Sequence, residues 1–253
     1  MKIALVTGAS SGMGAEFVRQ ISADGLADEI WAVARRKDRP DGLAREIKTP
    51  LYSLALDLTK GEDVAALHKE LELKKPQVFI AVNCAGFAKF GSYEDVRAED
   101  ELAMIDLNIR ALTEVSRMVL PYMREPAHLI QISSTSAFQP LPYMNVYAAG
   151  KAFVLNYSRA LAFELQSKGV SVTAVCPGWT STEFFDVAEE NASSSSVGNF
   201  LFMSKPEKVV KRAIKDALNG REMSVYGVTN KLHLFFSKII PASLIMRIWN
   251  MVK

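Results

Sequence analysis

The sequence predicts an α/β fold, a doubly wound parallel sheet in three αβα layers, within a single domain over residues 1–253. Short hydrophobic runs that end in glycine or small polar residues alternate with longer helical segments. The chain is 49% hydrophobic, enough for a complete core, and no break in composition marks a second domain. Ligands bind at the carboxyl ends of the strands in such sheets, so the residues after each hydrophobic run are candidate site residues.

The first unit is a strand over residues 2–7, a glycine-rich turn and a helix over residues 12–23. Glycines in this place let the backbone approach a pyrophosphate, which the free amides at the helix N-terminus stabilise. The spacing is Gly-x3-Gly-x-Gly instead of Gly-x-Gly-x-x-Gly, and a plain strand-to-helix turn is the alternative. The candidate cofactor-binding residues here are Gly8, Ser10, Ser11, Gly12, Met13 and Gly14.

The second strand, residues 29–34, ends at two arginines, Arg35 and Arg36. In a dinucleotide fold, the end of this strand faces the adenosine ribose. An acid there accepts a hydrogen bond from the 2′-hydroxyl of NAD, whereas arginine complements the 2′-phosphate of NADP. The first acid is Asp38. The sequence therefore favours NADP(H) over NAD(H), with a solvated basic loop as the alternative.

The next two strands end in further candidate cofactor residues. The strand over residues 51–56 leads into a short acid, which either holds the adenine amino group or caps the helix that begins near Lys60. The strand over residues 77–82 leads into small residues that allow the backbone to approach a ligand closely. The candidates from these two ends are Asp57, Leu58, Asn83, Ala85 and Gly86.

A serine, a tyrosine and a lysine follow the fifth strand, residues 128–133. Tyr147 and Lys151 are four residues apart and share one face of a helix, while Ser134 lies at the end of the strand. A neighbouring ammonium favours the phenolate and lowers the pKa of a tyrosine, which makes it a usable proton donor and acceptor. A chance pairing of tyrosine and lysine is the alternative.

Residues 179–204, after a strand over residues 170–175, carry aromatic residues and then a run of serines. This mixture suits a substrate lid, with a flexible connector as the alternative. A helix over residues 206–219 and a strand over residues 223–228 follow. Candidate walls of an apolar pocket are Phe87, Phe138, Tyr143, Trp179, Phe184 and Phe185.

The tail, residues 229–253, contains apolar and basic residues and no acid. We expect a helical cap that covers the substrate pocket or a subunit interface. An interfacial amphipathic segment, which would give peripheral membrane contact, is the less favoured alternative.

Composition argues against several other classes of protein. A net charge of +2, without a basic stripe and interleaved aromatics, argues against nucleic-acid binding. The three histidines have no metal-ligand spacing, so we expect no metal. No apolar run is long enough to span a membrane, the first one is too short for a signal peptide, and two cysteines suit a reducing compartment. These features predict a cytoplasmic protein.

Seven motifs in order resemble the short-chain dehydrogenase/reductase family, in its compact single-domain branch. The resemblance runs from residue 3 to about residue 182, and Cys84 departs from it where the family more often has a second asparagine. It rests on Thr7-Gly8-x3-Gly12-x-Gly14, Asp57-Leu58, Asn83-x-Ala85-Gly86, Asn108, Ser134, Tyr147-x3-Lys151 and Pro177-Gly178-x3-Thr182. It implies a Rossmann-type sheet with strand order 3-2-1-4-5-6-7 and a homodimer or homotetramer. In that order one strand separates Cys84 from Cys176, too far for a disulfide.

The resemblance also implies roles for individual residues. Tyr147 becomes the general acid and base, Lys151 binds the nicotinamide ribose and lowers the tyrosine pKa, and Ser134 bonds the substrate oxygen. Ser133 is the near alternative, rejected because adjacent strand residues point to opposite sides. Asn108, within a helical segment over residues 98–123, holds a water that relays protons. Pro177, Gly178 and Thr182 line the nicotinamide.

The expected function is an NADP(H)-dependent oxidoreductase that interconverts a ketone and a secondary alcohol on a hydrophobic small molecule. Hydroxysteroid-like and acyl substrates fit the aromatic residues best. The alternatives are a 3-oxoacyl thioester reductase and an NADP(H)-binding regulatory protein without turnover.

Overall fold

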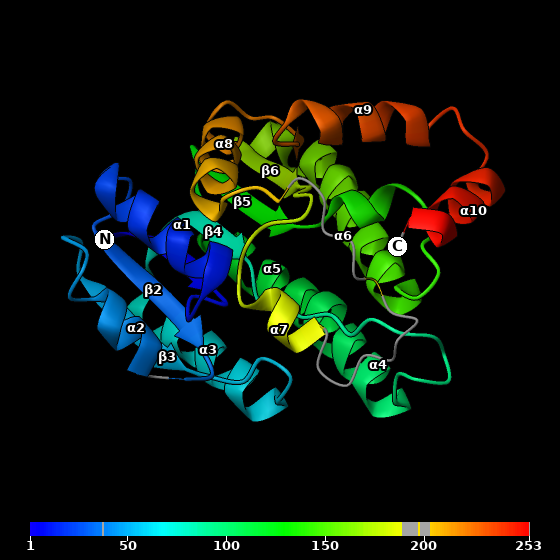
Figure 1. Ribbon diagram of the computed structural model, residues 1–253. Helices are drawn as coiled ribbons and strands as arrows, with labels where there is room; N and C mark the ends of the chain where they lie inside the picture. Colours follow the sequence, from blue (N-terminus) through cyan, green and yellow to red (C-terminus); the bar gives the residue numbers. More distant parts are fainter. Residues whose placement is uncertain (37, 189–196, 198–202, 253) are drawn as a thin grey trace.

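A seven-stranded parallel sheet with the order β3-β2-β1-β4-β5-β6-β7 forms the centre of the molecule, with helices on both faces (Figure 1). The computed structural model describes residues 1–36, 38–188, 197 and 203–252. The predicted doubly wound fold and strand order are confirmed. The strands are β1 Lys2–Thr7, β2 Glu29–Ala34, β3 Leu51–Ala55, β4 Gln77–Asn83, β5 Ala127–Ile132, β6 Val170–Val175 and β7 Met223–Ser224.

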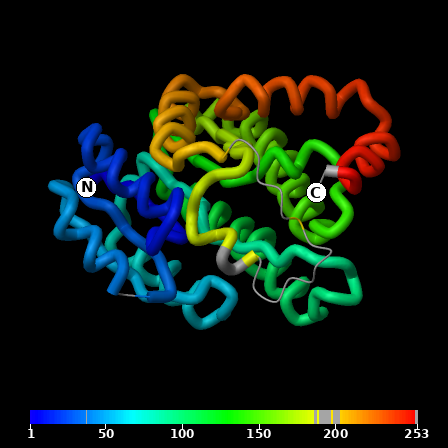
Figure 2. The backbone as a smooth tube through the Cα atoms, in the orientation of Figure 1, coloured from blue at the N-terminus to red at the C-terminus, as the bar shows by residue number. Residues whose placement is uncertain are grey.

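The helices connect successive strands, and two more follow the last strand. They are α1 Gly12–Ala23, α2 Asp38–Leu43, α3 Gly61–Lys74, α4 Ala98–Ile105, α5 Leu112–Val119, α6 Asn145–Leu165, α7 Phe184–Ala188, α8 Pro206–Leu218, α9 Val228–Ser237 and α10 Ala242–Val252. Figures 1 and 2 show α9 and α10 together, far from the edge of the sheet that β3 forms. The predicted helical pair in the tail is therefore present. Among the described residues, no helix has the length and apolar character needed to cross a bilayer.

The two faces of the sheet belong to different parts of the core. Ile3 and Leu5 of β1 pack with residues of α3, α5 and α6, whereas Ala4 and Val6 pack with residues of α1 and α8. Successive strand residues point to opposite faces, and both faces here are covered. This explains why the strands are almost continuously apolar in sequence.

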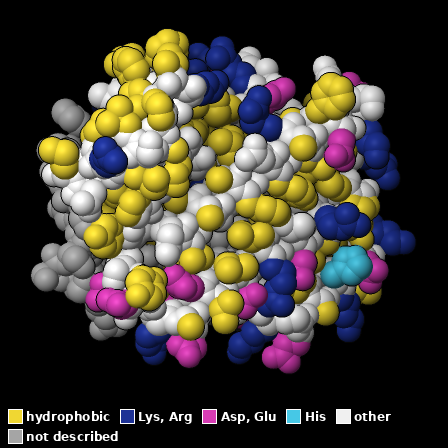
Figure 3. All heavy atoms as spheres, turned by 90° about the vertical axis from the view of Figure 1, so that its right-hand side faces the viewer, with side chains coloured by type: hydrophobic (Ala, Val, Ile, Leu, Met, Phe, Trp, Pro, Cys, Tyr) yellow, Lys and Arg dark blue, Asp and Glu magenta, His cyan; other side chains and the backbone are white. Residues whose placement is uncertain are grey.

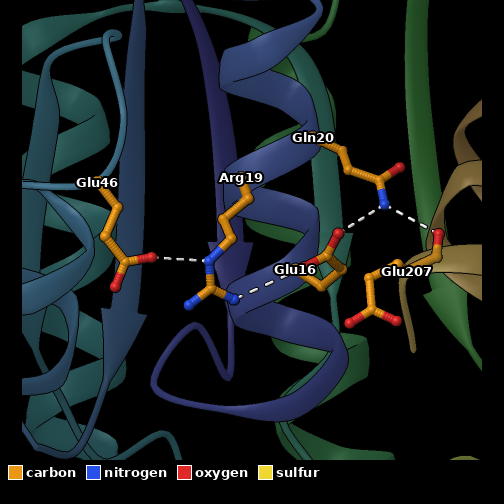
Figure 4. A network of polar contacts seen from close by, with 5 residues as sticks. All are labelled: Glu16, Arg19, Gln20, Glu46 and Glu207. Atoms are coloured by element: carbon orange, nitrogen blue, oxygen red, sulfur yellow. Dashed lines mark hydrogen bonds and ion pairs between the residues drawn. The ribbon is translucent and has the colours of Figure 1, made fainter. Parts of the chain in front are cut away.

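Polar contacts join α1 to its neighbours (Figure 4). Nε of Arg19 lies 2.8 Å from Oε2 of Glu46, and its Nη1 lies 3.6 Å from Oε2 of Glu16. Nε2 of Gln20 donates to Oε1 of Glu16 and to the backbone oxygen of Glu207 at the start of α8. These contacts hold α1, whose N-terminus faces the site, against the segments on either side of it.

Two elements differ from the sequence expectations. The last strand is shorter than residues 223–228, because only Met223 and Ser224 pair with β6 and the chain then turns at Gly227 into α9. The helical segment 98–123 is interrupted by a π-helical turn over Asp106–Ala111, and its last turn is a 3-10 helix over Leu120–Tyr122. π-Helical turns are frequent at functional sites, and this one contains Asn108.

Candidate active site

A cavity of about 890 Å³ lies at the carboxyl ends of the strands. At one end it is lined by the glycine-rich turn after β1 and by the residues that follow β2 and β3. The other end is lined by aromatic and aliphatic residues of the segment after β6 and of α9 and α10. Ser134, Tyr147 and Lys151 line the same cavity. The position at the strand ends is the one that the doubly wound fold predicts for a ligand.

The glycine-rich turn has a backbone that requires glycine. Gly8 has a φ of +67°, in the left-handed region, and a Cβ atom on Gly14 would lie 2.1 Å from the Gly8 carbonyl oxygen. The Ser11 side chain makes no capping hydrogen bond to α1, so the first amides of this helix are open to a ligand. All six predicted residues of the turn line the cavity. The turn therefore fits the pyrophosphate of a dinucleotide.

Thr7 is a structural partner of this turn that we did not include among the site residues. Its Oγ1 accepts hydrogen bonds from the amides of Cys84, at 3.0 Å, and Ala85, at 3.1 Å. It thereby ties the end of β1 to the segment after β4. The Thr-Gly pair at the end of the first strand was the feature of the sequence that could have indicated this role of Thr7.

Arg35 and Arg36 both line the cavity. Arg36 and Arg39 lie 3.8 and 3.1 Å from the carboxylate of Glu183, which directly precedes α7. Arg35 acts on the Asp57 carboxylate through its charge. Two of the three arginines thus already face an acid from the candidate lid.

Asp57 lines the cavity but does not cap α3, whose N-cap residue is Lys60. Its Oδ1 accepts hydrogen bonds from the backbone and the hydroxyl of Thr59. Burial by itself would raise the pKa of Asp57, but these bonds and the charges of Arg35 and Lys60 outweigh it, so the pKa is lowered. Leu58 lies beside it in the cavity wall.

The residues after β4 divide into two groups. Ala85 and Gly86 line the cavity, whereas Asn83 does not. The Asn83 amide is buried and donates to Oε1 of Gln131, at 3.0 Å, and to Oγ of Ser116, at 2.9 Å. The Asn83 side chain thus links β4 to β5 and to α5. The contact of Asn83 with a cofactor stays a prediction, and the structure shows its side chain bonded to Gln131 and Ser116.

The serine, tyrosine and lysine converge as their spacing predicted. Tyr147 and Lys151 are buried on α6, and the Ser134 hydroxyl lies near enough to the Tyr147 phenol to act on its pKa. Nζ of Lys151 lies 5.6 Å from the centre of the Tyr147 ring and donates to the backbone oxygen of Ile132 at 2.8 Å. Ser133 instead donates to the backbone oxygen of Lys151. The partner of the tyrosine is therefore Ser134 and not its neighbour.

The pKa of Tyr147 moves in the opposite direction to the expected one. Burial raises it, and the hydrogen bond with Ser134 only partly opposes this effect. Burial also lowers the pKa of Lys151 to about 8. The ammonium points toward the Ile132 carbonyl, so its effect on the phenol is too small to offset desolvation. Tyr147 is consequently held as a protonated phenol, the form that donates a proton.

Asn108 lies behind Gly86 and outside the cavity wall. Its Oδ1 accepts from the Phe87 amide at 3.1 Å, and its Nδ2 donates to the Phe87 carbonyl at 2.8 Å. A Cβ atom on Gly86 would lie 2.7 Å from Asn108 Oδ1 and 3.7 Å from Lys151 Nζ. Asn108 therefore fixes the backbone between the two ends of the cavity, directly beside Lys151.

The segment after β6 places Pro177, Gly178 and Thr182 in the cavity wall, and Thr182 packs on Gly12. Cys84 and Cys176 are free thiols at the ends of β4 and β6. Burial raises the pKa of each thiol to about 12, so both are protonated at neutral pH.

Aromatic rings form much of the other end of the cavity. Of the predicted walls, Phe87, Trp179, Phe184 and Phe185 line it, whereas Phe138 and Tyr143 do not. The Phe184 ring lies 5.7 Å from the ring of Tyr147, and Trp179 stacks on Trp249 of α10 at 6.5 Å. The candidate lid residues 189–196 and 198–202 lie outside the described part of the chain.

Residues of the tail that we did not single out complete this end. Asn230, His233 and Phe236 of α9 and Ile245 and Trp249 of α10 line the cavity. Trp249 Nε1 also donates to the Pro142 carbonyl at 2.9 Å, which fixes α10 over the loop before α6. These residues reach the cavity only because of the path that the chain takes after β7. In the sequence, the hydrophobic character of the tail was the only indication of this role. Within the described residues, no cluster of three or more His, Cys, Asp or Glu side chains could hold a metal ion.

Comparison with known proteins agrees with the site. A sequence model of the short chain dehydrogenases matches residues 2–193. Sulfoacetaldehyde reductase 2 of Chromohalobacter salexigens is 35% identical over 191 residues, 72% of this chain and 74% of that one. A short-chain dehydrogenase from Sphingobium yanoikuyae in complex with NADPH superposes with a TM-score of 0.79 at 27% identity, covering 95% of this chain and 97% of that one. A bulky-bulky ketone specific alcohol dehydrogenase from Comamonas testosteroni gives 0.75 at 25% identity, covering 94% and 92%.

The chain belongs to the short-chain dehydrogenase/reductase family. It is an NAD(P)-dependent oxidoreductase that acts on alcohol and ketone groups.

Proposed function

We propose that this enzyme interconverts a ketone and a secondary alcohol on a bulky hydrophobic small molecule, with NADP(H) as its cofactor. The observation that carries this proposal is a single cavity. Ser134 and Tyr147 line it together with the arginines after β2 and the aromatic residues Trp179, Phe184 and Trp249. The Comamonas alcohol dehydrogenase for bulky ketones supports the substrate class.

In this mechanism, Ser134 and Tyr147 hold the oxygen of the ketone between their hydroxyl groups. When bound, a reduced nicotinamide would supply the hydride that the carbonyl carbon accepts. Tyr147 then gives its phenolic proton to the oxygen, and in alcohol oxidation it takes the proton back. Lys151 binds the nicotinamide ribose and stabilises the phenolate that remains, and Asn108 holds the water that returns a proton through Lys151. Pro177, Gly178 and Thr182, which line the cavity, would contact the nicotinamide, while Asp57 would contact the adenine.

The preference for NADP(H) rests on Arg35 and Arg36, which would hold the 2′-phosphate. Replacement of Arg35 by alanine (Arg35→Ala) should raise the KM for NADPH about 10-fold to 100-fold, because one charge-assisted hydrogen bond is lost. The KM for NADH should change less than about threefold. Initial rates with both cofactors measure this. Arg45→Ala, an exposed arginine outside the cavity wall, is the matched control. Equal losses with NADPH and NADH would contradict the assignment.

A pH profile tests the role of Lys151. Burial lowers the pKa of Lys151 to about 8, so this side chain loses its charge above that pH. The kcat/KM for NADPH at saturating ketone reports the free enzyme, and we expect it to fall up to roughly tenfold for each pH unit above 8. Tyr147 stays protonated through this range, because burial raises its pKa. If kcat/KM stayed constant between pH 7 and pH 10, which is about two units above the pKa of Lys151, the reaction would not require a charged lysine.

We further propose that residues 179–204 act as a lid and that the tail, residues 229–253, caps the substrate end of the cavity. Phe184 beside Tyr147 and the bond from Trp249 to the Pro142 carbonyl support these roles. A homodimer or homotetramer is the proposed assembly, with the exposed Leu102, Phe153 and Phe163 of α4 and α6 as its apolar surface. Light scattering measures the mass of this assembly.

A panel of substrates tests the proposal directly. We expect NADPH consumption with bulky aromatic ketones or ketosteroids, and slow turnover with small aliphatic ketones. Preference for 3-oxoacyl thioesters would identify the enzyme as an acyl reductase instead. NADPH binding without turnover across the panel would favour the regulatory protein.

A further inference from the structure

The helices α9 and α10 carry an apolar surface that no described part of the chain covers. Val228, Leu232, Phe235 and Ile239 recur at helical spacing on and directly after α9, and Leu244, Ile248 and Met251 do so on α10. The exposed fractions of Phe235, Ile239 and Met251 are 57%, 62% and 84%. Figure 3, a view of the side where α10 lies, shows hydrophobic side chains gathered in its upper left. Exposed patches of this kind mark interaction sites.

Basic residues accompany this apolar surface, and acidic residues do not. Lys231 of α9, Lys238 directly after α9 and Arg247 of α10 are exposed. The sequence contains no aspartate or glutamate after Glu222. A short helix with large aliphatic and aromatic residues beside basic ones is the pattern of segments that lie in the headgroup region of a bilayer.

The charges argue against a second copy of the chain as the partner of this surface. A two-fold contact places the same patch on both sides, and Lys231, Lys238 and Arg247 would then face the same three residues of the other copy. The surface offers no acid to balance them. An anionic surface matches both the charge and the apolar residues.

The cavity reaches this surface. Phe236 of α9 and Ile248 of α10 line the cavity. Both side chains are also about half exposed to solvent. On the opposite side of α9, Asn230 packs closely against Gly178. A Cβ atom added to Gly178 would lie 2.5 Å from Asn230 Oδ1. The same helix pair thus bounds the reaction site on one side and the apolar surface on the other.

We propose that α9 and α10 dock the enzyme on the surface of an anionic phospholipid bilayer. Phe235, Ile239, Leu244 and Met251 enter the headgroup region, and Lys231, Lys238 and Arg247 contact lipid phosphates. The part of the cavity that Phe236 and Ile248 line then lies at the bilayer, so that an apolar ketone dissolved in lipid enters from the lipid side. This docking is independent of the proposed reaction, because the residues that make it lie outside the hydrogen-bonded site.

Sedimentation with vesicles tests the proposal on the purified protein of residues 1–253. We expect it to bind vesicles of phosphatidylcholine with roughly one third phosphatidylglycerol at least tenfold more tightly than pure phosphatidylcholine vesicles, with weaker binding at high salt. Neutralisation of the cations in the triple variant Lys231→Gln, Lys238→Gln, Arg247→Gln should weaken binding roughly 100-fold, about fivefold for each charge. The single variants Phe235→Glu and Met251→Glu should each weaken it at least tenfold.

The matched control is Leu73→Glu on α3, an exposed leucine far from this surface, which should leave vesicle binding unchanged. Thermal melting of each variant shows whether it is folded. The triple variant changes only the charges, so it tests them with every apolar residue of the surface still present. NADPH turnover with a water-soluble ketone should be unchanged in Met251→Glu, because the Met251 side chain is 84% exposed and does not line the cavity. Failure of docking and failure of the reaction are therefore separate results. Absence of wild-type binding to anionic vesicles overturns the proposal. Loss of oligomer mass in Phe235→Glu, without vesicle binding by the wild type, identifies a subunit interface instead.

Discussion

The variant Tyr147→Phe should bind NADPH with nearly unchanged affinity and lose turnover by a factor on the order of 10³. The phenylalanine ring keeps the contact with Phe184, but it removes the hydroxyl that bonds Ser134 and donates the proton. Steady-state rates give the loss of kcat, and the quenching of protein fluorescence by NADPH gives the affinity.

Tyr157→Phe is the matched control for this change. Tyr157 lies on the same helix, stacks on Phe153 at 5.7 Å and does not line the cavity. Its turnover should stay within about twofold of the wild type. If Tyr147→Phe also retained turnover, another residue would have to supply the proton.

Gly14→Ala should lower the free energy of unfolding by about 3 kcal/mol or more, because the new methyl group meets the backbone of the preceding turn. The Gly8 carbonyl oxygen would lie 2.1 Å from the added Cβ atom, and neither backbone segment can move freely. For a protein of this size, this corresponds to a fall in Tm of roughly 10 °C. Calorimetry or thermal melting by circular dichroism measures it.

Gly61→Ala is the corresponding control for the second prediction. Gly61 begins α3, and a Cβ atom there meets no other atom within 4 Å. This variant should be as stable as the wild type or up to about 1 kcal/mol more stable, because alanine favours the helix. A Gly14→Ala protein with the same Tm as Gly61→Ala would show that the turn after β1 is not packed as described.

The sequence predicted those parts of the molecule that depend on local periodicity and on strand ends. Strands β1, β2 and β6 have the predicted bounds because each is a largely buried run that a glycine, a charged residue or a Cys-Pro pair follows. The spacing of Tyr147 and Lys151 correctly placed both side chains in one buried site, because four residues make about one helical turn.

Properties that depend on distant contacts could not be predicted in this way. The direction of the Tyr147 pKa was wrong, because it depends on how deeply α6 buries the phenol and on the bond from Lys151 to the Ile132 carbonyl. The partners of the Asn83 side chain could not be predicted for a similar reason, since Ser116 and Gln131 lie beside it only in the folded protein. Glu183 meets Arg36 and Arg39 from more than 140 residues along the chain, a contact that no local pattern encodes.

The most direct test of the central claim is the transfer of deuterium from NADPH labelled at C4 of the nicotinamide to a bulky ketone. Both stereoisomers of the label are used in parallel, and the alcohol product is analysed by mass spectrometry and NMR. The account predicts one deuterium at the carbinol carbon from one of the two isomers with the wild-type protein, and no labelled alcohol with Tyr147→Phe. Consumption of NADPH without labelled alcohol, or equal labelling by the Tyr147→Phe variant, would contradict it.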